Sequence, residues 1–145
     1  MEENNKLDIN SLAVQSHLTI YQNLIQRMAS NSVSSKAWCI TLVSAILVIV
    51  ADKSNSQYAM IAYIPTLLFL VLDAYYLGLE KGFRNSYNKF IENLNKDKIE
   101  AKELFTILPK GNMYTLFFKS LISFSVWPFY LTLIIMIYIT KLIIF

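Results

Sequence analysis

Several residue types on which soluble enzymes and secreted domains depend are scarce in this sequence. Its 145 residues include one cysteine, one histidine, three glycines and three prolines, and 16% of them are charged. A single cysteine, Cys39, excludes an internal disulfide framework and a cysteine-rich zinc site. So little glycine and proline argues against a disordered or linker-rich chain. We therefore expect no metal and no cofactor, and the net charge of +3 is too small to indicate nucleic-acid binding.

Apolar residues, in contrast, are abundant. They make up 55% of the chain, and the mean hydropathy of +0.43 is typical of a membrane protein. Three runs are candidate spans: 37–51, 58–79 and 120–140. The six residues 52–57 between the first two runs predict a tight helical hairpin. The third run is uncharged and long enough to cross a hydrocarbon core of about 30 Å, with a kink expected at Pro128.

The basic residues predict the orientation of the spans. Seven Lys and Arg residues lie in 80–112 and three more in the segment that ends at Lys36, whereas the hairpin turn has only Lys53 and the C-terminal end only Lys141. Positive residues favour the cytoplasmic side. We expect a multi-pass protein of the inner membrane, with no cleaved signal peptide, a cytoplasmic N-terminus and a periplasmic C-terminus.

Helical periodicity continues beyond the apolar runs. Residues 1–36 are expected to contain a cytoplasmic amphipathic helix that enters the first span, because apolar residues recur there at spacings of three and four. Segment 80–112 repeats the pattern and then becomes a lysine-rich helix or loop. The predicted fold is one all-α membrane domain, in which a long antiparallel hairpin extends into the cytoplasm beside a third transmembrane helix.

The hairpin register predicts pairs of opposite charge. With the turn near Asn55, antiparallel neighbours have numbers that sum to about 110, which places Lys36 beside Asp73 and Arg27 beside Glu80, with Arg84 close by. Charged groups near lipid are costly unless they are paired. Two interpretations remain open: the pairs hold the hairpin together, or they hold a polar pathway between protomers closed.

A pathway through this protein would need several copies, since one hairpin and one span cannot enclose water. The polar residues Asn31, Ser32, Thr41 and Ser44 are the candidates for facing a shared axis, with Val48 as an apolar constriction. We therefore expect a homo-oligomer in contact with membrane lipid.

Catalytic motifs are absent from the sequence. It has no phosphate-binding glycine-rich loop, no HExxH and no nucleophile elbow. The one histidine, His17, is expected to be an exposed or hydrogen-bonded residue without a catalytic role. We expect that the protein is not an enzyme.

A set of residues in the first helix, the second span and the last span is typical of one family: Tyr21, Gln22, Ile25, Arg27, Met28, Ala29, Asn31, Ser32, Lys36, Trp38, Thr41, Asp73, Ala74, Tyr75, Tyr76, Leu77, Glu80, Phe83, Arg84, Ser125, Phe129 and Tyr130. In these residues the chain resembles a family of small bacterial membrane proteins that are similar in layout to anti-phage membrane effectors. The layout is that of SLATT-type effectors, retron transmembrane effectors and the accessory membrane protein of type VI-B CRISPR loci. It implies oligomerisation and damage to the inner membrane during abortive infection, with a cytoplasmic partner from the defence system.

One departure limits that resemblance. The CRISPR accessory protein and its relatives have an arginine and a later histidine separated by four to six residues, and no arginine precedes His17. Ribonuclease chemistry by that motif is excluded. The alternative to an effector is a non-catalytic anchor or scaffold that binds a cytoplasmic partner.

Overall fold

The structure is a computed structural model that describes residues 11–53, 56–96, 98–99, 103–104 and 106–143. Its principal elements are α1 (Leu12–Lys53), the 3-10 helix η1 (Ser56–Ala62), α2 (Tyr63–Asn95), α3 (Met113–Leu121) and α4 (Trp127–Ile143). These described residues contain no strand. The predicted all-α class is confirmed.

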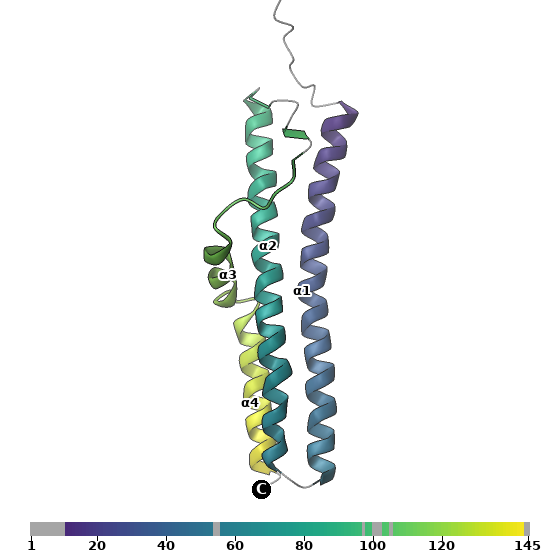
Figure 1. Ribbon diagram of the computed structural model, residues 1–145, viewed down its shortest axis with the longest axis vertical. Coiled ribbons are helices and arrows are strands. Elements are labelled where there is room, and N and C mark those ends of the chain that lie inside the picture. The colour runs from purple at the N-terminus through teal and green to yellow at the C-terminus, as the bar shows by residue number, and fades with distance from the viewer. Residues whose placement is uncertain (1–10, 54–55, 97, 100–102, 105, 144–145) are drawn as a thin grey trace, which may run out of the picture.

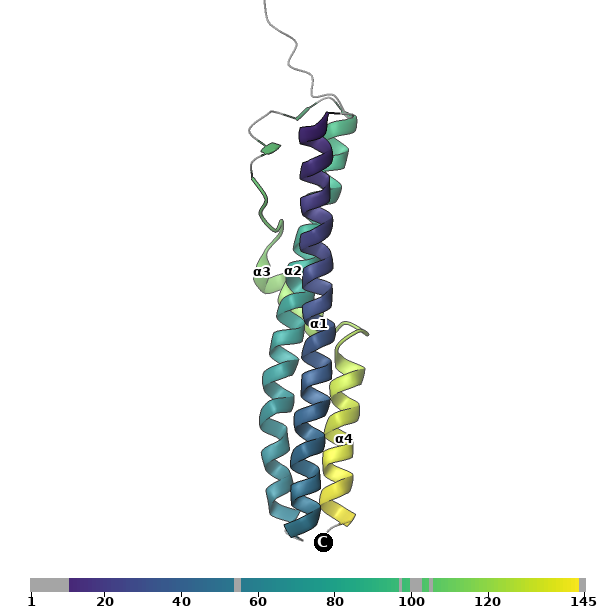
Figure 2. The ribbon, with the colours of Figure 1, turned by 90° about the vertical axis from the view of Figure 1, so that its right-hand side faces the viewer.

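Helices α1 and α2 form the long hairpin that the sequence predicts. They lie antiparallel and side by side in both views (Figures 1 and 2). Helix α1 has 42 residues, without glycine or proline, and is therefore about 63 Å long at about 1.5 Å per residue. The amphipathic helix before residue 36 thus continues into the first apolar run without a break, as predicted.

The second apolar run begins differently from the prediction. Its first residues belong to η1, and the α-helix starts at Tyr63 rather than at Tyr58. Pro65 provides the physical reason, because it has no N–H to donate to the carbonyl of Ile61. The tighter 3-10 pattern, which is common at helix ends, precedes it.

The prediction of one continuous helix over 120–140 is wrong. Helix α3 ends at Leu121, the chain turns, and α4 begins at Trp127. The Ser123 carbonyl accepts from the N–H groups of Val126 (2.8 Å) and Trp127 (3.1 Å). Pro128 does not kink a helix but lies in the first turn of α4, where its missing N–H costs nothing.

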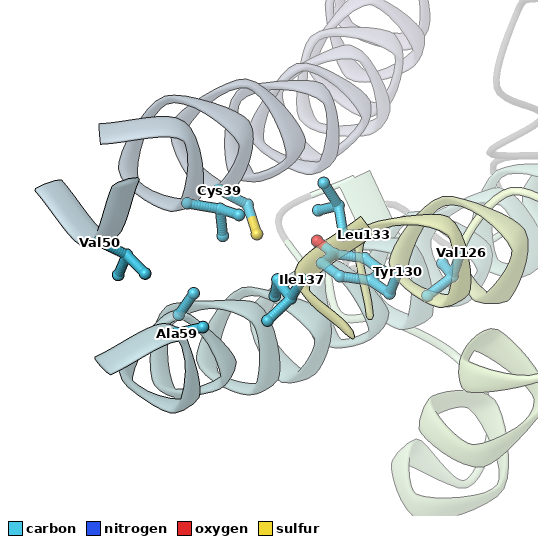
Figure 3. Close-up of a cluster of buried hydrophobic side chains, with 9 residues drawn as sticks. Cys39, Val50, Ala59, Val126, Tyr130, Leu133 and Ile137 are labelled. Atoms are coloured by element: carbon cyan, nitrogen blue, oxygen red, sulfur yellow. The ribbon is translucent and has the colours of Figure 1, made fainter. Parts of the chain in front are cut away.

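Helix α4 packs along the half of the hairpin that contains the turn. Its C-terminal end lies near that turn, so α4 runs in the same direction as α1 (Figures 1 and 2). Its inward side chains join those of α1 and η1 in an apolar core, against which Tyr63, Phe69, Leu70 and Leu77 of α2 pack. The buried members of this core are Cys39, Val43, Val50, Ala59, Ala62, Val126, Tyr130, Leu133 and Ile137 (Figure 3). With 17 residues, α4 is about 26 Å long, a little less than a hydrocarbon core of about 30 Å.

A second core lies at the opposite end of the hairpin. It consists of Val14, Tyr21, Phe90, Leu94 and Ile99, with Leu104 and Ile107 packed against it. The chain that follows α2 therefore folds back to cover the end of the hairpin. The two cores divide the hairpin into an apolar end, with α4, and a polar end.

Candidate functional site: a buried ion pair in the hairpin

The charges predicted to meet across the hairpin do so at Lys36 and Asp73. The Lys36 ammonium lies 2.6 Å from Asp73 Oδ2, and the Asp73 side chain is completely buried. The Ser32 hydroxyl donates to Asp73 Oδ1, and Lys36 Nζ donates to Ser32 Oγ at 3.2 Å. Ser32 and Lys36 are one turn apart on α1, so both reach the same carboxylate of α2.

Helix α4 approaches this cluster from a third side. The Tyr130 hydroxyl donates to the Phe69 carbonyl at 2.9 Å, and it lies within electrostatic reach of Asp73 and Cys39. The Lys36 ammonium, 2.6 Å away, compensates the buried Asp73 Oδ2. A carboxylate buried in this way is strongly destabilising if its counter-charge is removed.

The second predicted pair has a different partner. Glu80 Oε1 accepts from Arg84 Nε at 2.8 Å within α2, while Arg27 is exposed and forms no ion pair with Glu80. An i, i+4 pair on one helix needs little ordering of long side chains, whereas a bridge to Arg27 would cross the hairpin. The prediction of an Arg27–Glu80 contact is wrong. Gln26 of α1 and Arg84 of α2 both line a groove of about 370 Å³ between the two helices.

The four predicted pore-facing residues do not share one environment. Thr41 and Ser44 are exposed, as is Val48, whereas Asn31 is half-buried. Ser32 is buried inside the hairpin, against Asp73, so its predicted place on the outer face is wrong. Of the four residues, only Thr41 and Ser44, at the apolar end of α1, are therefore exposed.

His17 also differs from its predicted environment. It is 2% exposed and packs on Tyr21 and Phe90, with ring centroids 4.9 and 4.6 Å away. Neither ring nitrogen has a hydrogen bond of good geometry within the described residues. Burial lowers the pKa of His17, and the nearby backbone of Leu104 opposes that shift in part. The helical spacing to Tyr21 indicated the contact, but burial required the chain after α2 to fold back.

A stripe of small residues on α2 was not predicted from the sequence. Gly78, Gly82 and Ser86 are buried at successive spacings of four, and segment 108–121 lies against them. A Cβ on Gly82 would lie 2.8 Å from the Pro109 Cβ, so only glycine permits this approach. The Ser86 hydroxyl donates to the Leu108 carbonyl at 2.6 Å. The small-xxx-small spacing was the available signal.

The remaining chemistry of the site is sparse. Within the part of the chain that the structure describes, His, Cys, Asp and Glu do not gather in groups of three or more that could hold a metal ion. Cys39 is buried in the apolar core without a disulfide partner.

Comparisons of the chain with protein-family models, with curated proteins and with solved structures give no match.

Proposed function

We propose that the protein is an oligomeric effector of the bacterial inner membrane that permeabilises the membrane in anti-phage defence. Two helices are long and apolar enough to cross a membrane, within Leu12–Lys53 and Gln57–Asn95. Only 22% of the residues in each apolar window are buried, so most of this apolar surface is not used in the protein's own core. Lipid or further copies of the chain would cover such surface.

The observation that supports permeabilisation is an exposed face of α1 that has two hydroxyl groups among apolar side chains such as Val48. Thr41 and Ser44 lie on it, while Cys39 and Val43 on the other side pack into the core. The Thr41 hydroxyl donates to the Ala37 carbonyl at 2.9 Å, which lowers the cost of placing it in lipid. In an assembly of several copies, this face supplies polar groups to a shared axis.

In this proposal, the Lys36–Asp73 pair stabilises the resting state, in which α1 and α2 are packed together. It joins α1 to α2 where the apolar end of the hairpin meets the polar end, and Tyr130 of α4 lies beside it. Separating α1 from α2 would expose a carboxylate and an ammonium at the membrane edge. In this proposal, a cytoplasmic defence partner acts on the polar end of the hairpin and so shifts this pair.

The test combines expression with membrane potential. Wild-type protein, expressed with its trigger or in excess, is expected to collapse the potential and to give crosslinked species larger than dimers. Thr41→Leu with Ser44→Leu should retain expression and crosslinking but abolish depolarisation. Thr132→Leu is the matched control. Thr132 is also exposed and its hydroxyl also donates to a carbonyl one turn back, that of Pro128, but it lies on α4 and not on α1. Unchanged potential in expressed and triggered wild-type cells would refute the effector.

A scaffold is the second candidate, and the polar end of the hairpin favours it. A groove of about 410 Å³ lies between α2 and segment 103–110, lined by Tyr21, Lys89 and Lys110 among others. Such a groove can receive a side chain of a cytoplasmic partner. A scaffold would bind that partner without depolarising the membrane, so the potential measurement separates the two candidates.

The orientation has its own test. Reporter fusions after Asn55 and after Phe145 should be periplasmic, and one after Lys98 cytoplasmic. A cytoplasmic reporter at Phe145 would mean that α4 does not cross the membrane.

A further inference from the structure

The segment from α3 to the start of α4 exposes unusually large side chains. Tyr114 is 80% exposed and Phe124 83% exposed, and Phe118, Ile122 and Trp127 are also exposed. The buried contacts of α3 are made instead by its Leu116 and Phe117 positions against Gly82 and Gly78. The exposed groups are thus not part of any core in the chain, although they are large and mostly aromatic.

These side chains lie at a particular level of the hairpin. Gly78 and Gly82, which contact α3, are about one and a half and two and a half turns from Asp73 on the polar side. Two more exposed aromatic residues, Trp38 and Tyr75, are each two positions from a member of the Lys36–Asp73 pair. Aromatic residues from three helices therefore gather where the apolar end stops, which is the depth at which they are enriched in membrane proteins.

Two lysines from different helices occur at the same level. Lys81 of α2 is half-buried between the two glycines that contact α3, and Lys119 of α3 is exposed beside Phe118. Burial lowers the pKa of Lys81, and repulsion from Lys119 lowers it further, while Glu80 acts in the opposite direction. The Glu80 carboxylate, however, is already paired with Arg84. An anion between the two lysines would relieve their repulsion.

We propose that Lys81 and Lys119 bind the headgroup phosphate of an anionic phospholipid, while the exposed aromatic side chains of the α3–α4 segment insert at the lipid interface. This inference rests on the membrane location given in the proposed function. A phospholipid can contact both groups of side chains at once. Its phosphate binds the lysine ammonium groups, and the aromatic rings lie at the boundary between its headgroup and its acyl chains. The break in the predicted third span creates the site, because it turns α3 away from the path of α4.

The experiment measures retained lipid on full-length protein by native mass spectrometry, with phosphatidylglycerol and phosphatidylcholine supplied in equal amounts. Wild-type protein should retain phosphatidylglycerol preferentially. Replacement of Lys81→Gln and Lys119→Gln together should reduce that preference by about fivefold for each lysine, since one basic residue near an anionic surface contributes about a factor of five. Phe118→Ala should lower retention of both lipids equally.

Two controls keep the result specific. Lys89→Gln with Lys96→Gln removes the same charge from two lysines that pair with Glu92, and it should leave the preference unchanged. Lys81→Arg with Lys119→Arg should retain it, which separates loss of charge from loss of fold. Added inorganic phosphate should not displace the lipid; equal competition by phosphate would overturn the lipid assignment.

Membrane integration and headgroup selectivity can be measured separately. Alkaline carbonate extraction of wild-type protein tests membrane integration without any headgroup selectivity. Integrated protein with no preference for phosphatidylglycerol, or a Lys81→Gln/Lys119→Gln variant with the wild-type preference, would overturn the lipid site alone. Protein extracted by carbonate would overturn both.

Discussion

The two ends of the hairpin are built from the same two helices but are stabilised differently. At the apolar end, α4 contributes Tyr130, Leu133 and Ile137 to an aliphatic core, and apolar side chains also cover much of the outside. At the polar end, Tyr21 and Phe90 surround a histidine, a loop replaces α4, and the outside has charged groups such as Glu92. One pair of helices can thus serve two environments because both the covering element and the exposed side chains change along its length.

The ion pairs follow the same division. Lys36 and Asp73 meet across the hairpin where the carboxylate is completely buried. Glu92, with Lys89 and Lys96 on the same helix, forms a half-exposed cluster at the polar end. Burial makes the first pair costly to break, whereas solvent and salt weaken the second. The predictions that follow test this contrast, beginning with the largest effect.

Asp73→Ala should lower the free energy of unfolding by about 3 kcal/mol, because it leaves the Lys36 ammonium without its counter-charge in a largely buried site. The double variant with Lys36→Ala should recover part of that loss. Thermal unfolding in detergent measures both. Glu92→Ala at the polar end should cause no measurable change. Strictly additive effects of the Lys36 and Asp73 changes would contradict their coupling.

Gly82→Ala should destabilise the docking of segment 108–121 by about 1–3 kcal/mol, because the new Cβ would lie 2.8 Å from the Pro109 Cβ. Gly78→Ala is the matched control. There the nearest atom is the Phe117 backbone nitrogen at 3.4 Å, an ordinary contact, and alanine gains up to about 1 kcal/mol of helix propensity. Hydrogen exchange across 108–121 distinguishes the two variants. Equal exchange rates would mean that α3 does not depend on this approach.

Acid should loosen the polar end before the apolar end. Burial lowers the pKa of His17 from its ordinary value of 6.5, so below pH 6.5 the unfolded chain binds a proton that the folded chain resists. Stability is therefore complete above pH 6.5 and falls as the pH decreases, by at most about tenfold in the folding equilibrium for each pH unit. Hydrogen exchange at residues 12–25 and 86–95 between pH 7.5 and 5.5 measures this loss.

His17→Phe should remove that pH dependence while retaining the packing on Tyr21 and Phe90. Glu103→Gln is the second control, because the Glu103 carboxylate acts electrostatically on the neighbouring Tyr21. The same acid sensitivity in the phenylalanine variant would assign the effect to another group.

The smallest expected effect is at the boundary of the apolar end. Tyr130→Phe removes the hydrogen bond to the Phe69 carbonyl, at a cost of about 1 kcal/mol. Thermal unfolding in detergent measures it, and Tyr138→Phe, at an exposed position of the same helix, serves as the control. A loss as large as that of Asp73→Ala would mean that the hydroxyl also stabilises the ion pair.

Local patterns predicted a large part of the fold. The absence of glycine and proline from 12–53 predicts an unbroken helix, and six polar residues between two apolar runs predict a hairpin. Hairpin register alone then placed Lys36 beside Asp73, since antiparallel helices with a fixed turn leave few alternatives. These predictions succeeded because each depends on neighbours in sequence or on one simple symmetry.

Other features depended on contacts that no local pattern defines. The break at residues 122–126 arises where Pro128 favours a helix start over a helix interior, and both outcomes are compatible with the same apolar run. Glu80 selected Arg84 over Arg27 because a pair within one helix needs less ordering. His17 became buried only because the chain after α2 covers it.

The sequence by itself thus determined the two long helices, their hairpin, its register and the membrane-like composition, because these follow from periodicity, chain length and hydropathy. The tertiary structure alone decided that α3 docks on Gly78 and Gly82, that α4 covers only the apolar end, and that Ser32 faces Asp73 instead of an outer surface. The reason is that docking depends on the match between two distant surfaces, and a glycine stripe or a serine hydroxyl acquires its role only when the partner segment is in place.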